Sequence, residues 1–547
     1  MKNLLIGLIL LISASHSFSQ QVTNSYELIE SYTVQDIENM LSGIPGASLF
    51  ITPEYGVDFY RVKYDTEYLG GFTEVSGALI VPQNMDCKPA LFSYQHGTTS
   101  SKLDVPSYGS SELDICLFFA SEGNVVIAPD HIGLGASEVD IHPYIHGFSE
   151  AHTTINLMRA TREIITDDQD IDVELSNQIF LFGYSQGGFT TAIAARYIEE
   201  EYADEFDITA IAPMSGPYNL AGVQTDFVNS GEAYATPGYL PYIILGHQSV
   251  NPAIFDDPSD VFVYPYDTLM PYLFTGHNYS MGYINSQATP IPTDMIHPEV
   301  VQQIEDEDHP FYDALVENDL LDWVPKTRVN LYYCTADEQV TYENAIVAEE
   351  EWSNTSDQKI EAIDLGEYNH SDCVLFALIN GRNFFNSLNN NGIDFTVSYN
   401  ENLDQFEIEF PFGNENDFEI EWSNGATTPI LGDIDPDIVY TATVTDINSG
   451  CSHSESISVN PFATTKEFDN IAYSMYPNPT SDFVHLAFPS YGEYQITLFD
   501  ASGKVVFQKE AIQATDVSLN VSTLNSGTYI VEVREGKSMR KKRLVIK

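Results

Sequence analysis

A pentapeptide about a third of the way along the sequence has the pattern of a nucleophile turn. Residues 183–187 read Gly-Tyr-Ser-Gln-Gly, after the apolar run Ile179–Phe182 and before the alanine-rich helical stretch Phe189–Tyr197. In a strand–turn–helix setting this G-x-S-x-G turn is sharp, and the small residues around the serine avoid clashes. The pattern alone is a weak signal because glycine and serine are common residues. It predicts a nucleophilic Ser185 only if suitable partners follow in the chain.

Partners for this serine occur in the right order further along the chain. A serine hydroxyl needs a base, and the base needs a carboxylate that orients it. Asp337 lies in the loop that follows the strand-like run Val329–Tyr333. His370 comes after the next strand-like run and opens a predicted helix. The order serine, acid, histidine predicts a catalytic triad of Ser185, Asp337 and His370, with Glu338 as the alternative acid.

Two backbone N–H groups are expected to hold the oxyanion of such a reaction. The strand-like run Ala90–Tyr94 is followed by Gln-His-Gly-Thr at positions 95–98. On this kind of scaffold one donor follows such a His-Gly pair, and the other is the residue after the nucleophile. We therefore expect the N–H groups of Thr98 and Gln186 to form the oxyanion hole, each worth roughly 3 kcal/mol in the transition state. For His96 and Asp130 we expect structural roles.

The elements that must position these residues alternate between strand and helix. The strand-like runs are Ala78–Val81, Ala90–Tyr94, Val125–Ala128, Ile179–Phe182, Ile208–Ala212, Val329–Tyr333 and Lys359–Ile363. The helical patterns are Glu112–Ala120, Glu150–Ile165, Phe189–Glu201, Glu343–Trp352 and Cys373–Leu388. This alternation predicts an α/β fold, a doubly wound and mostly parallel sheet with helices on both faces. The alternation breaks over about 217–325, which predicts a cap or lid inserted at the functional edge.

The remaining segments differ in character. Residues 1–19 have a lysine, a short apolar core and small residues, as in a secretory signal peptide. The domain with the triad is expected to span 20–393. Residues 394–462 show period-two strands typical of a small β-sandwich, 463–470 read as a linker, and 471–547 is again strand and turn. No later stretch is long and apolar enough for a membrane helix.

Composition excludes some functions and leaves others open. The chain has 547 residues and a net charge of −58, so nucleic acid is not an expected partner. No Cys or His spacing suggests zinc, and the chemistry above needs no cofactor. Export permits disulfides, and the four cysteines of the first large region allow three pairings. We predict Cys87–Cys116 and Cys334–Cys373.

Residues 40–390 resemble α/β-hydrolases, and among them secretory lipases and related bacterial esterases. The phrases that carry this resemblance are Gly183–Gly188, Ala212–Tyr218 and His142–His146. Residues 394–462 resemble Ig-like modules of the PKD type, and 471–547 resemble the C-terminal sorting domain of the type IX secretion system. The resemblance implies a serine hydrolase that cleaves carboxylic esters through an acyl-enzyme. It also implies passage through the outer membrane by the type IX machinery, to a secreted or surface-attached location.

Two other functions stay open at this point. A serine peptidase of the prolyl type would use the same fold and triad, although no acidic pair for a substrate amino terminus and no propeller are evident. A surface adhesin on an inactive hydrolase scaffold would not need a catalytic triad, so the presence of all three triad residues in the expected order argues against this function. The sequence leaves open the acyl length, the alcohol portion and the choice among lipid, polysaccharide ester and polyester.

Overall fold

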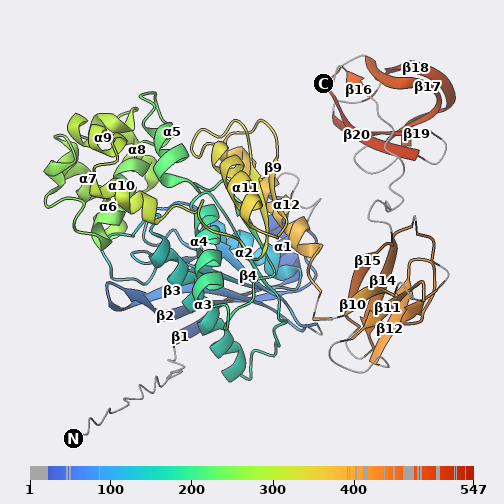
Figure 1. Cartoon of the computed structure of the whole chain (residues 1–547), viewed down its shortest axis with the longest axis horizontal. Coiled ribbons are helices and arrows are strands. Elements are labelled where there is room, and N and C mark those ends of the chain that lie inside the picture. Colours follow the sequence, from blue (N-terminus) through green and yellow to red (C-terminus); the bar gives the residue numbers. More distant parts are fainter. Residues whose placement is uncertain are drawn as a thin grey trace, which may run out of the picture. The chain divides into compact units, whose positions relative to one another are not determined.

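The computed structural model describes most of the chain in two compact units (Figure 1). The described residues are 22–44, 47, 51–85, 87–390, 392–393, 395–400, 403–410, 417–432, 434–436, 438–447, 450–459, 474–476, 480, 483–499, 505–522, 524, 527–535 and 538–547. The predicted signal peptide and the predicted linker at 463–470 lie outside these residues. The first unit ends at Ile393 and also takes in the segment that ends at Cys451, and the second unit contains the rest.

A nine-stranded sheet organises the described part of the first unit, with strand order β1-β2-β3-β5-β4-β6-β7-β8-β9. Its strands are β1 (Thr23–Tyr32), β2 (Val57–Tyr68), β3 (Gly71–Pro82), β4 (Leu91–Gln95), β5 (Val125–Pro129), β6 (Ile179–Tyr184), β7 (Ala210–Met214), β8 (Arg328–Tyr333) and β9 (Ile360–Asp364). The first three strands and the β3–β5 pair are antiparallel. From β5 to β9 all pairs are parallel, so the sheet is mostly parallel, as predicted.

The central strands form where the sequence is apolar on both faces. Every residue of β4, β5, β6 and β7 is buried, as expected for parallel strands covered by helices on both sides. Successive side chains enter different cores: Leu91 and Leu181 belong to one cluster, and Phe92 and Phe180 belong to the other. The two clusters are therefore the two faces of one sheet.

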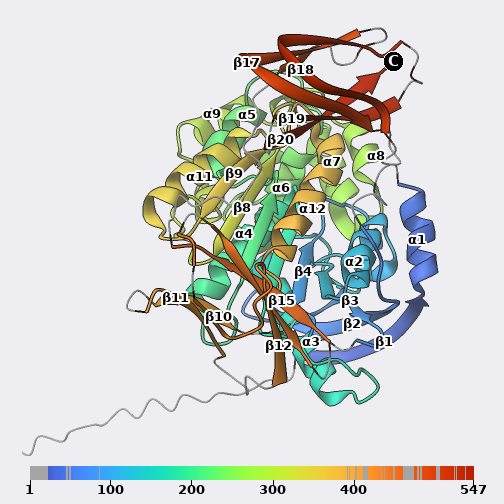
Figure 2. The same ribbon diagram turned by 90° about the vertical axis from the view of Figure 1, so that its right-hand side faces the viewer.

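Helices cover both faces of this sheet (Figures 1 and 2). One core cluster includes residues of α3 (Gly147–Asp167), α4 (Gln186–Glu201) and α11 (Glu343–Thr355). The other includes residues of α1 (Val34–Ser42), α2 (Ser111–Ser121) and α12 (His370–Asn386). The doubly wound α/β-hydrolase architecture is thereby confirmed. Of the described helices that cover the sheet, α1 was not anticipated, and strands β1 and β2 were not anticipated either.

A helical cap is inserted between β7 and β8, and its helices gather together in both views (Figures 1 and 2). They are α5 (Thr225–Val228), α6 (Tyr239–Val250), α7 (Tyr266–Phe274), α8 (Met281–Gln287), α9 (Pro298–Glu305) and α10 (Pro310–Glu317). The start and end of the insertion are tied together by Asp319, whose carboxylate accepts hydrogen bonds from the backbone N–H groups of Leu220 and Ala221. Within the described chain, no helix is long and apolar enough to cross a membrane.

The second unit is built from strands. Two three-stranded antiparallel sheets, β10-β11-β13 and β12-β14-β15, come first. A five-stranded sheet follows, in which β17 pairs with β16, β18 and β19. Their bounds are β10 (Thr396–Asn400), β11 (Gln405–Glu409), β12 (Phe418–Trp422), β13 (Ile430–Leu431), β14 (Tyr440–Asp446), β15 (Ser452–Ile457), β16 (Ser474–Tyr476), β17 (Phe483–Phe499), β18 (Val505–Asn520), β19 (Gly527–Glu535) and β20 (Ser538–Ile546). The assignment of 394–462 to the PKD type stays a prediction.

One of the two predicted disulfides is wrong. Cys334 and Cys373 are bonded as predicted, but Cys87 pairs with Cys451 and not with Cys116. Cys116 is a free, fully buried thiol on α2, where its Sγ lies 3.7 Å from the Glu112 carbonyl oxygen. Because that thiol belongs to the core between α2 and the sheet, it is not presented to Cys87.

Candidate active site

Ser185 lies on a strained turn between β6 and α4. Its φ and ψ are 62° and −119°, a conformation that L-residues rarely adopt. The turn is possible because its neighbours are glycines: a Cβ on Gly183 would lie 2.5 Å from the Gln95 carbonyl oxygen, and one on Gly187 only 1.9 Å from it. The Ser185 N–H donates to the Met214 carbonyl at 2.9 Å. The strain is held by the two strands that flank β6.

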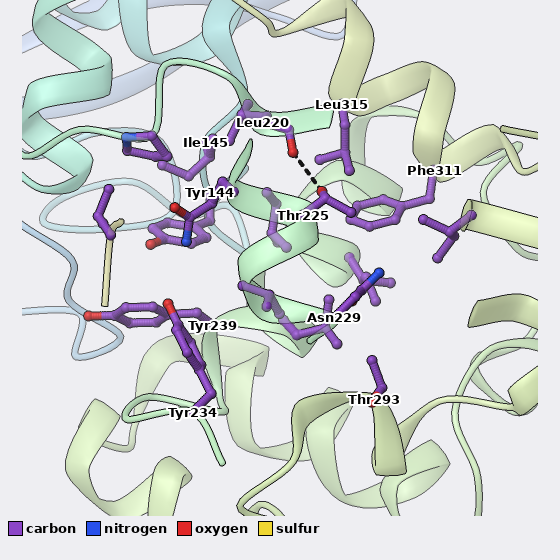
Figure 3. A pocket seen from close by; sticks show the side chains of 18 of the residues that line it. Tyr144, Ile145, Leu220, Thr225, Asn229, Tyr234, Tyr239, Thr293, Phe311 and Leu315 are labelled. Carbon is purple, nitrogen blue, oxygen red and sulfur yellow. Dashed lines mark hydrogen bonds between the residues drawn. The ribbon is translucent and has the colours of Figure 1, made fainter. Parts of the chain in front are cut away.

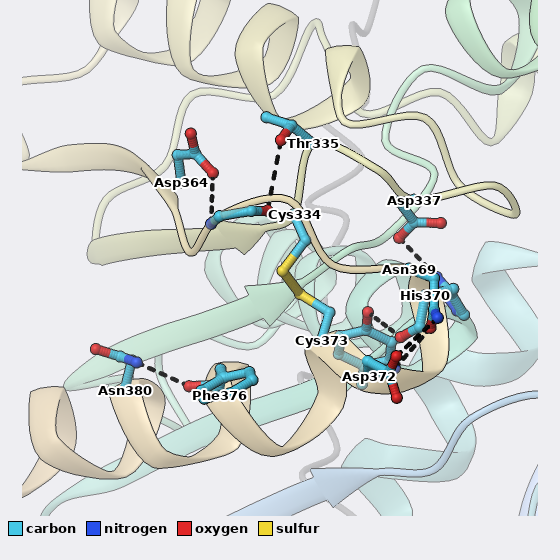
Figure 4. The surroundings of a disulfide bond; sticks show 12 residues. Cys334, Thr335, Asp337, Asp364, Asn369, His370, Asp372, Cys373, Phe376 and Asn380 are labelled. Carbon is cyan, nitrogen blue, oxygen red and sulfur yellow. Dashed lines mark hydrogen bonds and ion pairs between the residues drawn. A yellow bond between two sulfur atoms is a disulfide. The ribbon is translucent and has the colours of Figure 1, made fainter. Parts of the chain in front are cut away.

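Asp337 and His370, two of the three predicted triad residues, lie within hydrogen-bond distance of each other (Figure 4). His370 Nδ1 lies 2.7 Å from Asp337 Oδ2, and both side chains are buried. The other carboxylate oxygen of Asp337 accepts the N–H groups of Gln339 and Val340, each at 2.9 Å. Since an ionised carboxylate can only accept, Nδ1 carries the proton of this bond, and Nε2 is left free to act as a base. His370 is the first residue of α12, after Asn369, whose side chain caps the helix.

Glu338, the alternative acid, contacts the backbone of the histidine and not its ring. Its Oε2 accepts the His370 N–H at 3.0 Å. Burial alone would raise the pKa of Glu338, but this hydrogen bond and others from the backbone and Gln339 outweigh it and lower the pKa. The two neighbouring carboxylates therefore contact different parts of His370: Asp337 contacts the imidazole ring, and Glu338 accepts the backbone N–H.

Tyr184, which directly precedes Ser185, contacts both the ring and the backbone of His370. The ring of Tyr184 lies 4.9 Å from the His370 ring, centroid to centroid, and its hydroxyl donates to the His370 carbonyl at 2.7 Å. Ser185 is 7% exposed and His370 is 6% exposed. Among the hydrogen bonds of the described residues, none joins Ser185 Oγ to His370 Nε2, and this bond commonly forms or tightens only when substrate binds.

Thr98 and Gln186, the expected oxyanion donors, follow β4 and open α4, respectively. Among the described residues, neither backbone N–H donates to another protein group, whereas the neighbouring N–H of Gly97 lies 3.4 Å from Glu112. The first N–H groups of a helix lack intrahelical partners and lie at the positive end of its dipole. The N–H of Gln186 is such a group, and it is the kind of donor that a developing oxyanion requires.

His96 and Asp130 brace the loops below the site. Asp130 is fully buried and accepts hydrogen bonds from the Ser76 hydroxyl at 2.6 Å and from the Ser107 N–H at 3.1 Å. Burial raises its pKa despite these bonds. The His96 Nδ1 lies 2.7 Å from the Gly97 carbonyl, and its ring packs 4.9 Å from that of His131. These contacts fit the structural roles expected for both residues.

An apolar cavity adjoins Ser185 and runs under the cap (Figure 3). It encloses about 850 Å³ of space not filled by atoms, counting its open mouth. Its lining includes Ser185 and Gln186 from the turn and Tyr144 and Ile145 from the loop before α3. From the insertion between β7 and β8 the lining residues are Pro217, Leu220, Gln224, Thr225, Val228, Asn229, Tyr234, Tyr239, Leu240, Ile243, Ile244, Thr293, Ile296, Val301, Ile304, Phe311 and Leu315. None of the lining residues is charged.

Sequence reasoning missed a buried polar network beside the turn. Glu150 on α3 is fully buried and accepts the side-chain N–H of Gln186 at 2.8 Å and the Ile145 N–H at 2.9 Å. Burial raises the pKa of Glu150 to about 7, although its hydrogen bonds lower it. A glutamate in a helix is usually solvated, so the sequence gives no sign of this burial.

The described residues contain no group of three or more His, Cys, Asp or Glu side chains that could hold a metal ion. The arrangement supplies a hydroxyl, an oriented imidazole, free backbone donors and an apolar cavity. Together these suit transfer of an acyl group to a serine, followed by its transfer from the serine to water.

Two segments of the chain match models of known protein families. Residues 110–254 match the profile of the secretory lipase family, and residues 474–547 match the secretion system C-terminal sorting domain. A search of curated protein sequences found no significant match.

Solved structures of hydrolases are similar to this chain over about two thirds of its length. A hydrolase of Legionella pneumophila has 25% identity and a TM-score of 0.62, and covers 67% of this chain and 98% of its own. The rice cell wall degrading esterase LipA of Xanthomonas oryzae has 29% identity and a TM-score of 0.57, over 66% of this chain and 95% of its own. Candida antarctica lipase A, at 18% identity, a TM-score of 0.52 and coverage of 67% and 84%, shares the fold. The chain is therefore a carboxylic-ester hydrolase of the lipase and esterase type on the α/β-hydrolase fold, secreted or displayed at the cell surface under the direction of its sorting domain.

Proposed function

We propose that Ser185, His370 and Asp337 cleave the ester through an acyl-enzyme, with the N–H groups of Thr98 and Gln186 as the oxyanion hole. The observation that carries this proposal is the 2.7 Å contact between His370 Nδ1 and Asp337 Oδ2, in a chain whose strained Ser185 opens onto an apolar cavity. The contact fixes the imidazole tautomer that a general base requires.

The reaction follows the usual two halves of acyl transfer. Ser185 Oγ attacks the carbonyl carbon while His370 Nε2 takes its proton, and the carbonyl oxygen becomes an oxyanion held by the two N–H groups. His370 then gives the proton to the departing alcohol, which leaves an acyl group on Ser185. Water attacks this acyl group, again losing its proton to His370, and the carboxylic acid is released as Oγ regains the proton. Asp337 stabilises the imidazolium at each stage.

The substrate class follows from the cavity lining. A cavity lined by isoleucine, leucine, valine and aromatic side chains favours an apolar acyl group, since each buried CH₂ contributes roughly 0.8 kcal/mol. An amine terminus of a peptide would find no carboxylate among the described lining residues, which argues against the prolyl-peptidase alternative. We therefore propose esters of long, apolar carboxylic acids as substrates, with the acyl chain under the cap.

The domains beyond the hydrolase are proposed to serve export and spacing. The match over 474–547 supports engagement of the type IX secretion machinery, followed by removal of this domain or by anchoring at the surface. The strands at 394–462 are proposed to be a PKD-type spacer between the enzyme and the sorting domain.

Acyl specificity gives the test. Leu315 and Phe311 of α10 lie in the cavity on the side away from Tyr144 (Figure 3). With nitrophenyl butyrate, octanoate, laurate and palmitate as substrates, wild type should prefer the longer chains, and Leu315→Trp should shift the preference toward butyrate. The exposed Val316→Trp on the same helix is the control and should leave the preference unchanged. Turnover of a proline amide that exceeds turnover of every ester would contradict the proposal.

A further inference from the structure

The loop before α3 and the first turn of α3 contact both residues proposed as oxyanion donors. Tyr144 reaches Thr98 and Glu150 reaches Gln186, the two residues whose N–H groups are free. Neither contact is needed to explain the fold of the sheet; the Glu150 contact is buried, and the Tyr144 contact is partly buried. The segment therefore links the two halves of the site that come from β4 and β6.

The Tyr144 contact fixes the loop after β4. Tyr144 Oη lies 2.9 Å from Thr98 Oγ1, and its ring stacks on Tyr242 of the cap helix α6 at 4.4 Å with an interplanar angle of 4°. The hydroxyl of Tyr242 donates to the next carbonyl, that of Thr99, at 3.0 Å. The two stacked tyrosines thus bind the loop at the consecutive residues Thr98 and Thr99. Tyr144 also lines the apolar cavity beside Ser185.

The Glu150 contact fixes the residue after the nucleophile. The side-chain nitrogen of Gln186 lies 2.8 Å from Glu150 Oε1 and 2.9 Å from His142 Nε2. His142 Nδ1 faces the Ile132 carbonyl at 2.8 Å, so Nδ1 carries the proton and Nε2 accepts. Both amide hydrogens of Gln186 are then used, while its Oε1 has no partner among the described residues. Glu150 and His142, rather than Oε1, determine how this side chain lies.

A strained residue joins the two contacts. Ile145 has a φ of 57°, an unfavourable conformation for a β-branched side chain, and its N–H donates to Glu150 Oε1 at 2.9 Å. The same oxygen therefore holds the strained turn and the Gln186 amide. Ile145 follows Tyr144 directly, so displacement of the Glu150 carboxylate would disturb both donors.

We propose that Tyr144 and Glu150 are positioning residues that preorganise the oxyanion hole, Tyr144 through Thr98 and Glu150 through Gln186. An oxyanion hole accelerates the reaction because its donors are aimed before charge develops, so the residues that aim them contribute to the transition state more than to substrate binding. This inference rests on the proposed oxyanion hole and adds the side chains that hold it.

The test uses the full chain with nitrophenyl octanoate as substrate and octylboronic acid, which forms a tetrahedral adduct with a serine, as the transition-state probe. Tyr144→Phe keeps the stacking and removes only the hydroxyl. It should lower kcat roughly tenfold and weaken boronate binding by a similar factor, with KM within about twofold. Glu150→Ala should do the same, whereas Glu150→Gln, which retains an acceptor oxygen, should restore most of kcat.

The matched control is Tyr64→Phe on β2, which removes another buried hydroxyl bond, to the Thr153 carbonyl at 2.9 Å. It should leave kcat and boronate binding within about twofold of wild type once activity is normalised to folded protein. Equal losses in Tyr64→Phe and Tyr144→Phe, or a rise in KM at constant kcat in Tyr144→Phe, would overturn the inference. If Glu150→Ala does not fold, the kinetics of Tyr144→Phe and Glu150→Gln test the positioning role.

A Ser185→Ala variant separates this inference from the function on which it rests. Full ester turnover in Ser185→Ala would refute the proposed mechanism and this inference with it. Loss of turnover in Ser185→Ala together with unchanged kcat in Tyr144→Phe would refute the positioning role alone.

Discussion

Cys334 and Cys373 are joined by a disulfide that brackets the acid and the base of the proposed triad (Figure 4). Cys334 follows the last residue of β8 and precedes Asp337 by three positions, and Cys373 follows His370 by three positions in the first turn of α12. Because the bond ties these two short stretches covalently, it limits how far the Asp337 carboxylate and the His370 ring can separate.

Removal of this disulfide is predicted to reduce both stability and turnover. The closed loop has a sequence separation of 39 residues, and for such loops Cys334→Ser with Cys373→Ser should lower the unfolding free energy by about 2–4 kcal/mol. Fluorescence of Trp323 and Trp352, which are buried in the first unit, can follow urea unfolding. Cys116→Ala, which breaks no crosslink, should cost about 1 kcal/mol and leave kcat unchanged. An unchanged kcat in the double variant would contradict the bracketing role.

The two adjacent carboxylates are predicted to differ in their effect on turnover. Asp337→Asn can still contact Nδ1 but favours the wrong imidazole tautomer, so kcat should fall by about 10³–10⁴-fold. Glu338→Gln keeps an acceptor for the His370 N–H, and kcat should fall less than about tenfold. Steady-state kinetics on one ester measures both variants. A larger loss in Glu338→Gln would assign the role of the acid to Glu338.

The glycine after the nucleophile turn is predicted to tolerate no side chain. A Cβ on Gly187 would lie 1.9 Å from the Gln95 carbonyl oxygen, so Gly187→Ala should cost at least about 3 kcal/mol or abolish soluble expression. Gly282 in α8 has no atom within 4 Å of its Cβ position, and Gly282→Ala should stabilise the chain by up to about 1 kcal/mol. Urea midpoints of the two variants give the comparison, and equal midpoints would contradict the predicted crowding at Gly187.

Stability should depend on pH through Glu199 of α4. Its carboxylate accepts the Trp323 indole N–H and the Lys326 N–H at the end of the cap, and burial raises its pKa to about 7. A carboxyl whose pKa is raised by folding binds its proton more tightly in the folded chain. The stability that this proton contributes is therefore complete below the ordinary pKa of 4.5 and lost as pH rises to about 7.

Glu199→Gln cannot ionise and should remove this contribution. Wild type should lose stability between about pH 5 and about pH 8, and Glu199→Gln should not lose this part. The urea midpoint of the variant minus that of wild type should therefore be larger at about pH 8 than at about pH 5. The exposed Glu201→Gln at the end of the same helix is the control and should show the same difference from wild type at both pH values. A Glu199→Gln midpoint that moves with pH as wild type does would contradict the assignment.

The fold was largely predictable from the sequence where local pattern and burial agree. The apolar runs that became β4, β5 and β6 are buried on both faces, so a short continuous apolar stretch was a reliable signal. Strand β2 was missed although its residues alternate, because its polar positions made it unlike the central strands. The Asp337–His370 contact could be expected because each residue follows a parallel strand, and such strand ends meet at one edge.

Other features depend on contacts that no local pattern reports. Cys87 and Cys451 are separated by 364 positions, and nothing near either residue points to the other. Glu150 is polar within an amphipathic helix, and only the packed structure shows that it faces Gln186 rather than water. Tyr144 and Thr98 are likewise 46 positions apart in the sequence, and their contact depends on the packing of two loops against each other.

Covalent labelling with a nitrophenyl alkylphosphonate tests the proposed mechanism most directly, because this reagent reacts with a serine only when a base and an oxyanion hole activate it. Mass spectrometry of the full chain should find one phosphonyl group on the peptide that contains Ser185, with ester turnover lost in proportion. Ser185→Ala should remain unlabelled, and His370→Ala should label far more slowly than wild type. Labelling at another residue, or turnover that persists after Ser185 is fully modified, would contradict the mechanism.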